Sequence, residues 1–317
     1  MTGAPYRLAH LTDPHFRSLA GVRLVDFTGK RAVGILNVAV NRRRVHKMEL
    51  LEAMADDLVL QRPDHVVVSG DLSNVSLEAE WREGLRWLER LGRSAEDVTV
   101  IPGNHDAYVP DVVKSGVFER LFGAYQSVRP ERGERAGRTR NGYPFLRLRG
   151  PVAIVAVNSC VATGDIGAWG DIGAEQLAAL RAMLDLPEAR ARRRVVVLHH
   201  PPVQLKGGEE RNLRDRHVLA EVLREVGADL VIHGHDHRDE LARLPGPADR
   251  PIPVVGAGSA SYAGAADRRA RYNIYAFGAQ GEPVAVTTRA HDEPTNAFRE
   301  VRSERLGETA RASESNF

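Results

Sequence analysis

Short runs of β-branched and other apolar residues alternate along the chain with longer segments in which apolar residues recur every three or four positions. The short runs predict buried strands over 7–11, 65–69, 98–101, 152–157, 195–198 and 230–232. The longer segments predict amphipathic helices over 48–58, 77–88, 174–186 and 215–226, with Ser76 as the N-cap of the second. Alternation of strands and helices is typical of layered α/β folds.

The pattern changes after residue 251. Strands are predicted over 253–256, 272–277 and 283–288, separated by Gly and Pro, which indicates a second and more antiparallel sheet. After about Ala290 the chain is polar and aperiodic, which predicts an extended or disordered tail. We therefore expect one domain over 1–290 with an insertion at 16–47, followed by a polar C-terminal tail at 291–317.

Composition narrows the class of protein. The chain has 317 residues, and 44 Lys and Arg against 42 Asp and Glu give a net charge of +2, which does not mark a nucleic-acid binder. Cys160 is the single cysteine, so an internal disulfide is excluded. The N-terminus lacks the apolar run of a signal peptide, and no stretch approaches the roughly 20 apolar residues of a membrane span. A cytoplasmic location is expected.

Residues of the types that bind metals follow five of the predicted strands, where open α/β sheets carry their binding loops. The five groups are Asp13-Pro14-His15, Gly70-Asp71, Gly103-Asn104-His105-Asp106, His199-His200-Pro201-Pro202 and His233-Gly234-His235-Asp236-His237. Any one of them, taken alone, is more often a turn, a cap or a hydrogen-bonded core histidine. Five at strand ends favour a shared site, and carboxylate, imidazole and amide donors suit Mn²⁺, Fe²⁺ or Zn²⁺.

In this order, the motifs D-x-H, G-D, G-N-H-D, H-x-P and G-H-x-H resemble the signature of calcineurin-like metallophosphoesterases, over roughly residues 6–240. The resemblance implies an α/β fold, a four-layer αββα sandwich of two mixed sheets, and makes 1–290 a catalytic domain. It also implies a pair of divalent ions. Asp13, His15 and His237 would bind one ion, Asn104, His199 and His235 would bind the other, and Asp71 would bridge the two. His200 and His233 fall outside the pattern and are expected to be structural.

The resemblance also implies a reaction. Two ions about 3.5–4 Å apart, Mn²⁺ first and Fe²⁺ or Zn²⁺ as alternatives, would generate a bridging hydroxide that attacks phosphorus. His105 would stabilise or protonate the leaving oxygen, the alternative being a loop-packing histidine. Asp106 is expected to anchor its loop. Phosphoprotein phosphatases carry G-D-x-x-D-R. In this chain Asn74 stands where that motif has its second Asp. Protein phosphatase activity is therefore not expected, and Asn74 is a candidate to orient His105.

The insertion at 16–47 is strongly basic, with eight Lys and Arg opposed only by Asp26, and its centre at 32–40 is apolar. Two interpretations remain open. Residues 30–47 could contact lipid headgroups as a peripheral segment at the inner membrane, or the insertion could pack over the domain as a flap with solvated arginines.

Through its insertion the chain is similar to bacterial UDP-2,3-diacylglucosamine pyrophosphatases, and through its metal motifs it is similar to class III cyclic-nucleotide phosphodiesterases. The expected function is hydrolysis of a phosphodiester or pyrophosphate, with UDP-2,3-diacylglucosamine in lipid A synthesis first and a 3′,5′-cyclic nucleotide as the alternative. A DNA nuclease is disfavoured by the near-zero net charge. A non-catalytic scaffold is disfavoured because all seven ligand positions and His105 are present. The oligomeric state is left open.

Overall fold

A computed structural model describes residues 4–18, 20, 31, 34, 45–139, 141–163, 167–204, 209–278, 282 and 284–306. Most of the predicted insertion at 16–47 lies outside the described residues, as do residues 307–317. The prediction of membrane contact through 30–47 therefore concerns a segment of which the structure describes only Arg31, Gly34 and 45–47. No helix in the described part of the chain is long and apolar enough to cross a membrane.

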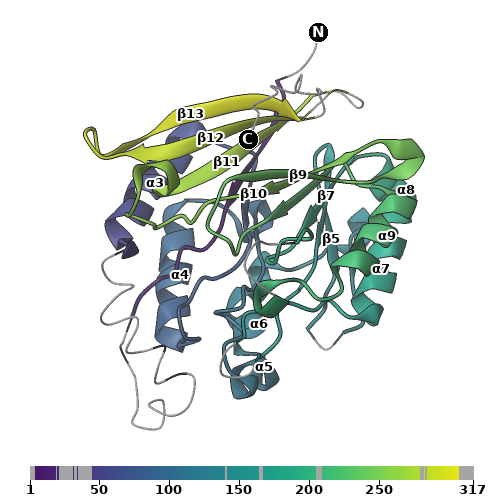
Figure 1. Cartoon of the computed structure of the whole chain (residues 1–317), viewed down its shortest axis with the longest axis horizontal. Coiled ribbons are helices and arrows are strands. Elements are labelled where there is room, and N and C mark those ends of the chain that lie inside the picture. The colour runs from purple at the N-terminus through teal and green to yellow at the C-terminus, as the bar shows by residue number, and fades with distance from the viewer. Residues whose placement is uncertain are drawn as a thin grey trace.

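One sheet has six strands, in the spatial order β13-β12-β11-β1-β2-β3. Strands β1, β2 and β3 run parallel, whereas β11, β12 and β13 are added antiparallel to the β1 edge. The bounds are β1 (Tyr6–Leu11), β2 (His65–Val68), β3 (Val98–Val100), β11 (Arg271–Phe277), β12 (Val284–Asp292) and β13 (Ala297–Leu306). Strands β11, β12 and β13 of this mixed sheet lie at the upper left of Figure 1.

The other sheet has seven strands, in the order β4-β5-β6-β7-β8-β10-β9. Its centre, from β6 to β10, is parallel, and an antiparallel strand flanks it on each side. The bounds are β4 (Arg135–Ala136), β5 (Phe145–Arg149), β6 (Val152–Ala156), β7 (Arg193–Val197), β8 (Leu230–His233), β9 (Glu240–Leu244) and β10 (Ile252–Gly256).

Helices cover the outer face of each sheet (Figure 1). On the six-stranded sheet lie α3 (Met48–Gln61) and α4 (Glu78–Arg90), and on the seven-stranded sheet lie α7 (Ala174–Asp185), α8 (Pro187–Arg190) and α9 (Arg216–Val226). Two short helices, α5 (Pro110–Ser115) and α6 (Val117–Phe122), follow β3. Single 3₁₀ turns occupy 95–97, 123–125, 130–132, 209–211, 247–249 and 266–268.

Three apolar clusters match this layering. Two lie between a sheet and its covering helices, and the third lies between the sheets, where Leu8 and Tyr275 of one sheet meet Ile154 and Ile232 of the other. Apolar runs such as Val195–Val197 are buried on both faces for this reason. The predicted four-layer αββα sandwich is confirmed.

Three local predictions are wrong. The tail expected after Ala290 forms the end of β12 and the ten-residue edge strand β13 as far as Leu306. Strand β10 joins β8 in the parallel part of the seven-stranded sheet and is not part of a separate antiparallel sheet. Ser76 is not a helix cap, because α4 begins at Glu78 with Leu77 at the N-cap position, and the Ser76 hydroxyl donates instead to the carbonyl of His105 (2.8 Å).

Candidate metal centre

All seven predicted metal ligands lie in loops at the carboxyl ends of parallel strands. Asp13, His15, Asp71 and Asn104 follow β1, β2 and β3 of the six-stranded sheet. His199, His235 and His237 follow β7 and β8 of the seven-stranded sheet. Because the two sheets pack face to face, these loops meet at one end of the sandwich, which is where open α/β sheets place their ligand sites.

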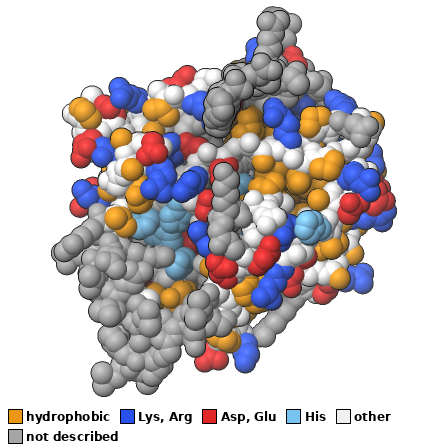
Figure 2. Space-filling model, in the orientation of Figure 1, with side chains coloured by type: hydrophobic (Ala, Val, Ile, Leu, Met, Phe, Trp, Pro, Cys, Tyr) orange, Lys and Arg blue, Asp and Glu red, His pale blue; other side chains and the backbone are white. Residues whose placement is uncertain are grey.

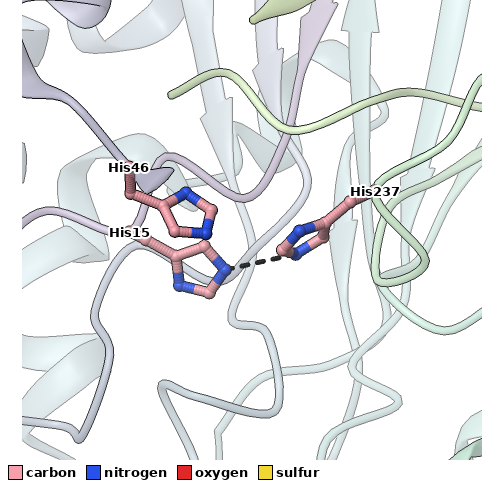
Figure 3. Close-up of side chains that lie close together, drawn as sticks. All are labelled: His15, His46 and His237. Carbon is pink, nitrogen blue, oxygen red and sulfur yellow. Dashed lines mark hydrogen bonds between the residues drawn. The ribbon is translucent and has the colours of Figure 1, made fainter. Parts of the chain in front are cut away.

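A first group of ligand atoms comes from Asp13, His15, Asp71 and His237, and these atoms all lie within 4.8 Å of one another. The Nε2 atom of His237 lies 3.1 Å from Oδ1 of Asp13 and 3.2 Å from Nε2 of His15. Figure 3 shows the His15 and His237 rings pointing at each other from loops that are far apart in the sequence. Two carboxylates and two imidazoles facing one point are a ligand set that suits a divalent transition ion.

A second group adjoins the first. The Asn104 side-chain oxygen lies 3.1 Å from Nε2 of His199 and 2.8 Å from Nδ1 of His235. Asp71 stands between the groups, with Oδ1 3.5 Å from Nε2 of His199 and Oδ2 3.9 Å from Nε2 of His15. Each oxygen of the Asp71 carboxylate therefore faces a different group.

Backbone carbonyls fix the orientation of three of these histidines. His15 donates from Nδ1 to the carbonyl of Ser73 (3.2 Å), and His199 donates from Nδ1 to the carbonyl of Ser69 (2.8 Å). His235 donates from Nε2 to the carbonyl of Arg211 (3.1 Å). In each ring the other nitrogen, which then carries a lone pair, faces the cluster. This is the arrangement of metal-binding histidines, whose distal N–H is held by an oxygen acceptor.

The ligand loops are conformationally strained. Asp13, His15, Asp71, His235 and His237, five of the seven predicted ligands, have φ between 47° and 75°. Residues other than glycine rarely adopt this left-handed region, at a cost of about 1–3 kcal/mol each, and such strain gathers at functional sites. The surrounding hydrogen bonds hold the side chains inward against that cost.

Two glycines of the motifs, Gly103 and Gly234, are required because residues of other loops lie very close to them. A Cβ atom on Gly103 would lie 2.1 Å from both the backbone nitrogen and Oδ1 of Asp71. A Cβ atom on Gly234 would lie 2.0 Å from Oγ1 of Thr12, which itself donates to Oδ2 of Asp13 (2.7 Å). These glycines therefore allow loops of different strands to reach the same point.

Burial and charge set the protonation states that metals need. Burial acts to raise the pKa of the Asp13 carboxyl, but His237, with His199 and His15, holds that pKa well below its usual range. Burial lowers the pKa of His199 and of His235, so both imidazoles are neutral at pH 7. An ionised carboxylate and neutral imidazoles are the forms that bind divalent ions.

The loop after β3 carries His105 and Asp106. The His105 backbone N–H donates to Oδ1 of Asp71 (2.7 Å), and its Nδ1 donates to the backbone carbonyl of Asn74 (2.5 Å). Asn74 thus orients His105 through its main chain, while its side chain donates to the carbonyls of His15 (3.2 Å) and Phe16 (2.9 Å). The Asp106 carboxylate accepts five hydrogen bonds and anchors the loop, as predicted.

Comparison with known proteins agrees with this site. The sequence profile of the calcineurin-like phosphoesterases matches residues 6–239. The chain belongs to the calcineurin-like phosphoesterase family. It is accordingly a metal-dependent phosphoesterase, and the motifs from Asp13 to His237 all fall within the matched region.

Solved structures share the fold of this phosphoesterase at low sequence identity. A dimetal phosphatase from Danio rerio has 12% identity and a TM-score of 0.59, over 96% of this chain and 99% of that one. The purple acid phosphatase PPD1 from yellow lupin has 12% identity and a TM-score of 0.61, over 97% of this chain and 54% of that one. A search of curated proteins gives no match.

Three histidines outside the predicted ligand set, His46, His200 and His233, differ in their surroundings. His200 bonds Oγ of Ser159 (2.8 Å) and the carbonyl of Ala168 (3.2 Å), and burial lowers its pKa well below the usual value, which fits the structural role predicted for it. His233 likewise donates to the carbonyl of Gly234 (3.0 Å). His46, which was not predicted, lies against the His15 and His237 rings. It directly precedes α3 and follows none of the strands predicted from the sequence, so the strand-end rule could not find it.

Proposed function

We propose that this phosphoesterase hydrolyses a phosphodiester or phosphoanhydride bond at a site holding two divalent metal ions, Mn²⁺ first and Fe²⁺ or Zn²⁺ as alternatives. The observation that carries the proposal is the position of Asp71, whose two carboxylate oxygens face two separate groups of donors. A carboxylate placed in this way can bridge two ions. The remaining donors are one carboxylate, one amide oxygen and four imidazoles, a set that fits borderline divalent ions.

The ligands divide between the two ions as follows. Asp13, His15 and His237 would hold the first ion, because their donor atoms converge with Asp71 within 4.8 Å. Asn104, His199 and His235 would hold the second, because the Asn104 oxygen contacts both imidazoles. When bound, two such ions lower the pKa of water and polarise the phosphate oxygens.

His105 is the candidate catalytic side chain. Its Nδ1 proton is committed to the carbonyl of Asn74, so Nε2 is the atom that can carry a proton to a leaving oxygen. The ring is held by stacking on Tyr108, with a centroid distance of 5.5 Å, and edge-on against His15, at 5.1 Å. Asn74 would act as a positioning residue, through its main chain.

The substrate class is proposed from the sequence, and one contact places Arg31 of the insertion near the site. The chain lacks the G-D-x-x-D-R motif of protein phosphatases and has a basic insertion similar to that of UDP-2,3-diacylglucosamine pyrophosphatases. Arg31, within that insertion, donates to the carbonyls of Val75 (3.2 Å) and Ser76 (3.1 Å), beside the loop of His105. A lipid-linked pyrophosphate is the first candidate because of the insertion, and a 3′,5′-cyclic nucleotide, which the metal motifs fit equally well, is the second.

The reaction is tested with purified protein, Mn²⁺ and bis-(p-nitrophenyl) phosphate. Asp71→Ala should reduce turnover at least 100-fold, on the order of the loss of one well-placed electrostatic group, while keeping the circular dichroism of the wild type. Asp56→Ala, at an exposed position of α3, is the control. Hydrolysis by Asp71→Ala at the wild-type rate would contradict the bridging role.

Parallel assays of UDP-2,3-diacylglucosamine and cyclic AMP decide between the two substrates. Membrane contact through 30–47 is a separate proposal, which rests on the sequence alone. Replacing Arg42, Arg43 and Arg44 by Glu should reduce co-sedimentation with anionic liposomes. Equal sedimentation would leave the flap interpretation.

A further inference from the structure

Three imidazoles, those of His15, His46 and His237, meet on one side of the candidate metal centre. One ligand atom from each lies within 4.8 Å of the others. Figure 3 shows the His46 ring beside the His15–His237 pair. His46 is 4% exposed, and its ring centroid lies 4.7 Å from that of His15 and 5.7 Å from that of His237. The family pattern assigns no role to this residue.

The main chain and one hydroxyl hold His46 in place. His46 forms an antiparallel bridge with Tyr262, flanked by hydrogen bonds from Lys47 N to Ser261 O (2.9 Å) and from Ala263 N to Val45 O (2.7 Å). The Nδ1 atom lies 2.8 Å from Oγ of Ser261. When the Ser261 hydroxyl donates to Nδ1, the ring proton resides on Nε2.

The loop that holds His46 also holds the first predicted ligand. Ser259 donates its hydroxyl to the carbonyl of Asp13 (2.8 Å), and Ala260 N donates to the carbonyl of Thr12 (2.9 Å). Ser259 and Ser261 are fully buried. The His46 ring and the Asp13 loop are therefore fixed to the same three-residue segment, the kind of support that a precisely placed side chain requires.

The position of His46 beside the predicted metal ligands suits a donor to a bound phosphate. The Asp13 and Asp71 carboxylates group with His15 and His237, whereas the group that contains His46 consists of imidazoles alone. Two carboxylates and two imidazoles already meet at the first position, and catalytic metal sites keep a coordination position open for substrate. An N–H beside that position would meet the oxygen of a bound phosphate. Figure 2 shows histidine side chains gathered at the surface next to Lys and Arg side chains.

We propose that His46 is a substrate-binding residue, whose Nε2–H donates to a non-bridging oxygen of the phosphate group held at the Asp13, His15 and His237 side of the site. The inference rests on the proposed function, because it requires a phosphate group at this site. Two other roles make different predictions. As a further metal ligand His46 would govern metal content, and as a packing residue it would affect neither metal nor phosphate.

The experiment compares His46→Ala and His46→Gln with the wild type, all loaded with Mn²⁺. Inorganic phosphate is the probe, measured by calorimetry and as a competitive inhibitor, and metal content is measured by mass spectrometry. We expect both variants to retain the wild-type metal content. In His46→Ala, the Kd for phosphate and the KM for bis-(p-nitrophenyl) phosphate should rise about tenfold, the effect of one charge-assisted hydrogen bond, with a smaller change in kcat. His46→Gln, whose amide can donate, should recover part of the loss.

His65→Gln is the matched control. His65 is equally buried and also bonds a hydroxyl, Oγ1 of Thr99 (2.8 Å), but it lies at the opposite end of β2 from Asp71. This variant should bind phosphate as the wild type does. If His46→Ala does not fold, His46→Gln carries the test, with a smaller rise in Kd.

Loss of metal from the His46 variants, or unchanged phosphate affinity and KM, would overturn the inference. If the wild type is active and the His46 variants keep its phosphate affinity and KM, the role of His46 is refuted and the proposed function is not. A wild type that neither binds phosphate in the presence of Mn²⁺ nor hydrolyses any phosphodiester would refute the proposed function, and the role of His46 with it.

Discussion

The Asp106→Asn substitution should destabilise the fold through the loops that carry the predicted metal ligands. Oδ1 of Asp106 accepts from Ser73 N (2.8 Å), Ser73 Oγ (2.8 Å) and Trp81 Nε1 (2.8 Å). Oδ2 accepts from Leu72 N (3.0 Å) and Gly103 N (2.9 Å). The carboxylate thereby ties the loop after β2, which carries Asp71, to the loop after β3.

An asparagine amide can keep only one of these two sets of donors. If its oxygen takes the Oδ1 set, its NH₂ group faces the N–H groups of Leu72 and Gly103, and two buried donors lose their acceptor. At about 1–3 kcal/mol for each unsatisfied group, the loss is about 2–6 kcal/mol. Burial raises the pKa of the Asp106 carboxyl, because it disfavours the ionised form. Replacing the carboxylate by a neutral amide therefore offsets part of the lost stability. We therefore expect about 2–3 kcal/mol, a large part of a typical stability of about 5–15 kcal/mol.

Urea denaturation at pH 7.5 in EDTA measures this change, with Asp56→Asn as the control. Asp56 lies on the surface of α3 with its side chain 73% exposed, and its substitution should change the free energy of unfolding by less than about 0.5 kcal/mol. A loss in Asp106→Asn no larger than that of the control would refute the reasoning. In titrations with Mn²⁺, Asp106→Asn should also bind the metal more weakly, because the Asp71 and Asn104 loops are no longer tied together.

Three further predictions concern the same region. Gly103→Ala should lower Mn²⁺ affinity at least tenfold by calorimetry, because the new methyl group would meet Asp71; wild-type affinity would contradict the close approach. Removing metal with EDTA should lower the wild-type Tm, because a ligand at 100 times its Kd stabilises the folded state by about 2.7 kcal/mol. The Tm of Asp71→Ala should fall less. Equal changes in Tm would mean that the stabilising metal binds elsewhere. Burial holds the pKa of His65 well below 6.5. Below pH 6.5 the unfolded chain therefore binds a proton that the folded chain does not. The free energy of unfolding then falls by about 1.4 kcal/mol for each pH unit. His65→Gln should remove that contribution, visible as a shallower fall in urea-unfolding free energy between pH 6 and pH 5; an unchanged slope would refute it.

The fold and the convergence of ligands were predictable because both follow from periodicity and from strand ends. Apolar runs buried on both faces mark the parallel strands, and the loops that follow them meet where the two sheets pack. The search for apolar runs missed β5, because Arg147 and Arg149 interrupt the apolar pattern of that strand although both are buried. Their guanidinium groups satisfy backbone carbonyls such as that of Glu96, a tertiary contact that local pattern cannot show.

Two other features escaped prediction for different reasons. Strand β13 is an edge strand with mostly exposed and charged side chains, so its composition is that of a solvated tail, and only pairing with β12 makes it a strand. His46 reaches the site through pairing with Tyr262, a contact between residues far apart in the sequence. In both cases the determining contact is with another segment, and the residue pattern of the segment itself does not show it.

Each of the two proposed metal positions would draw its ligands from both sheets. The ions would therefore link the two central layers at one end of the sandwich. The distance between the ions would depend on how the two sheets pack against each other. Protein interiors are close-packed and transmit displacement. A change of side-chain volume between the sheets, at Ile154 or Ile232 for example, would thus reach the catalytic end as altered metal binding without touching a single ligand.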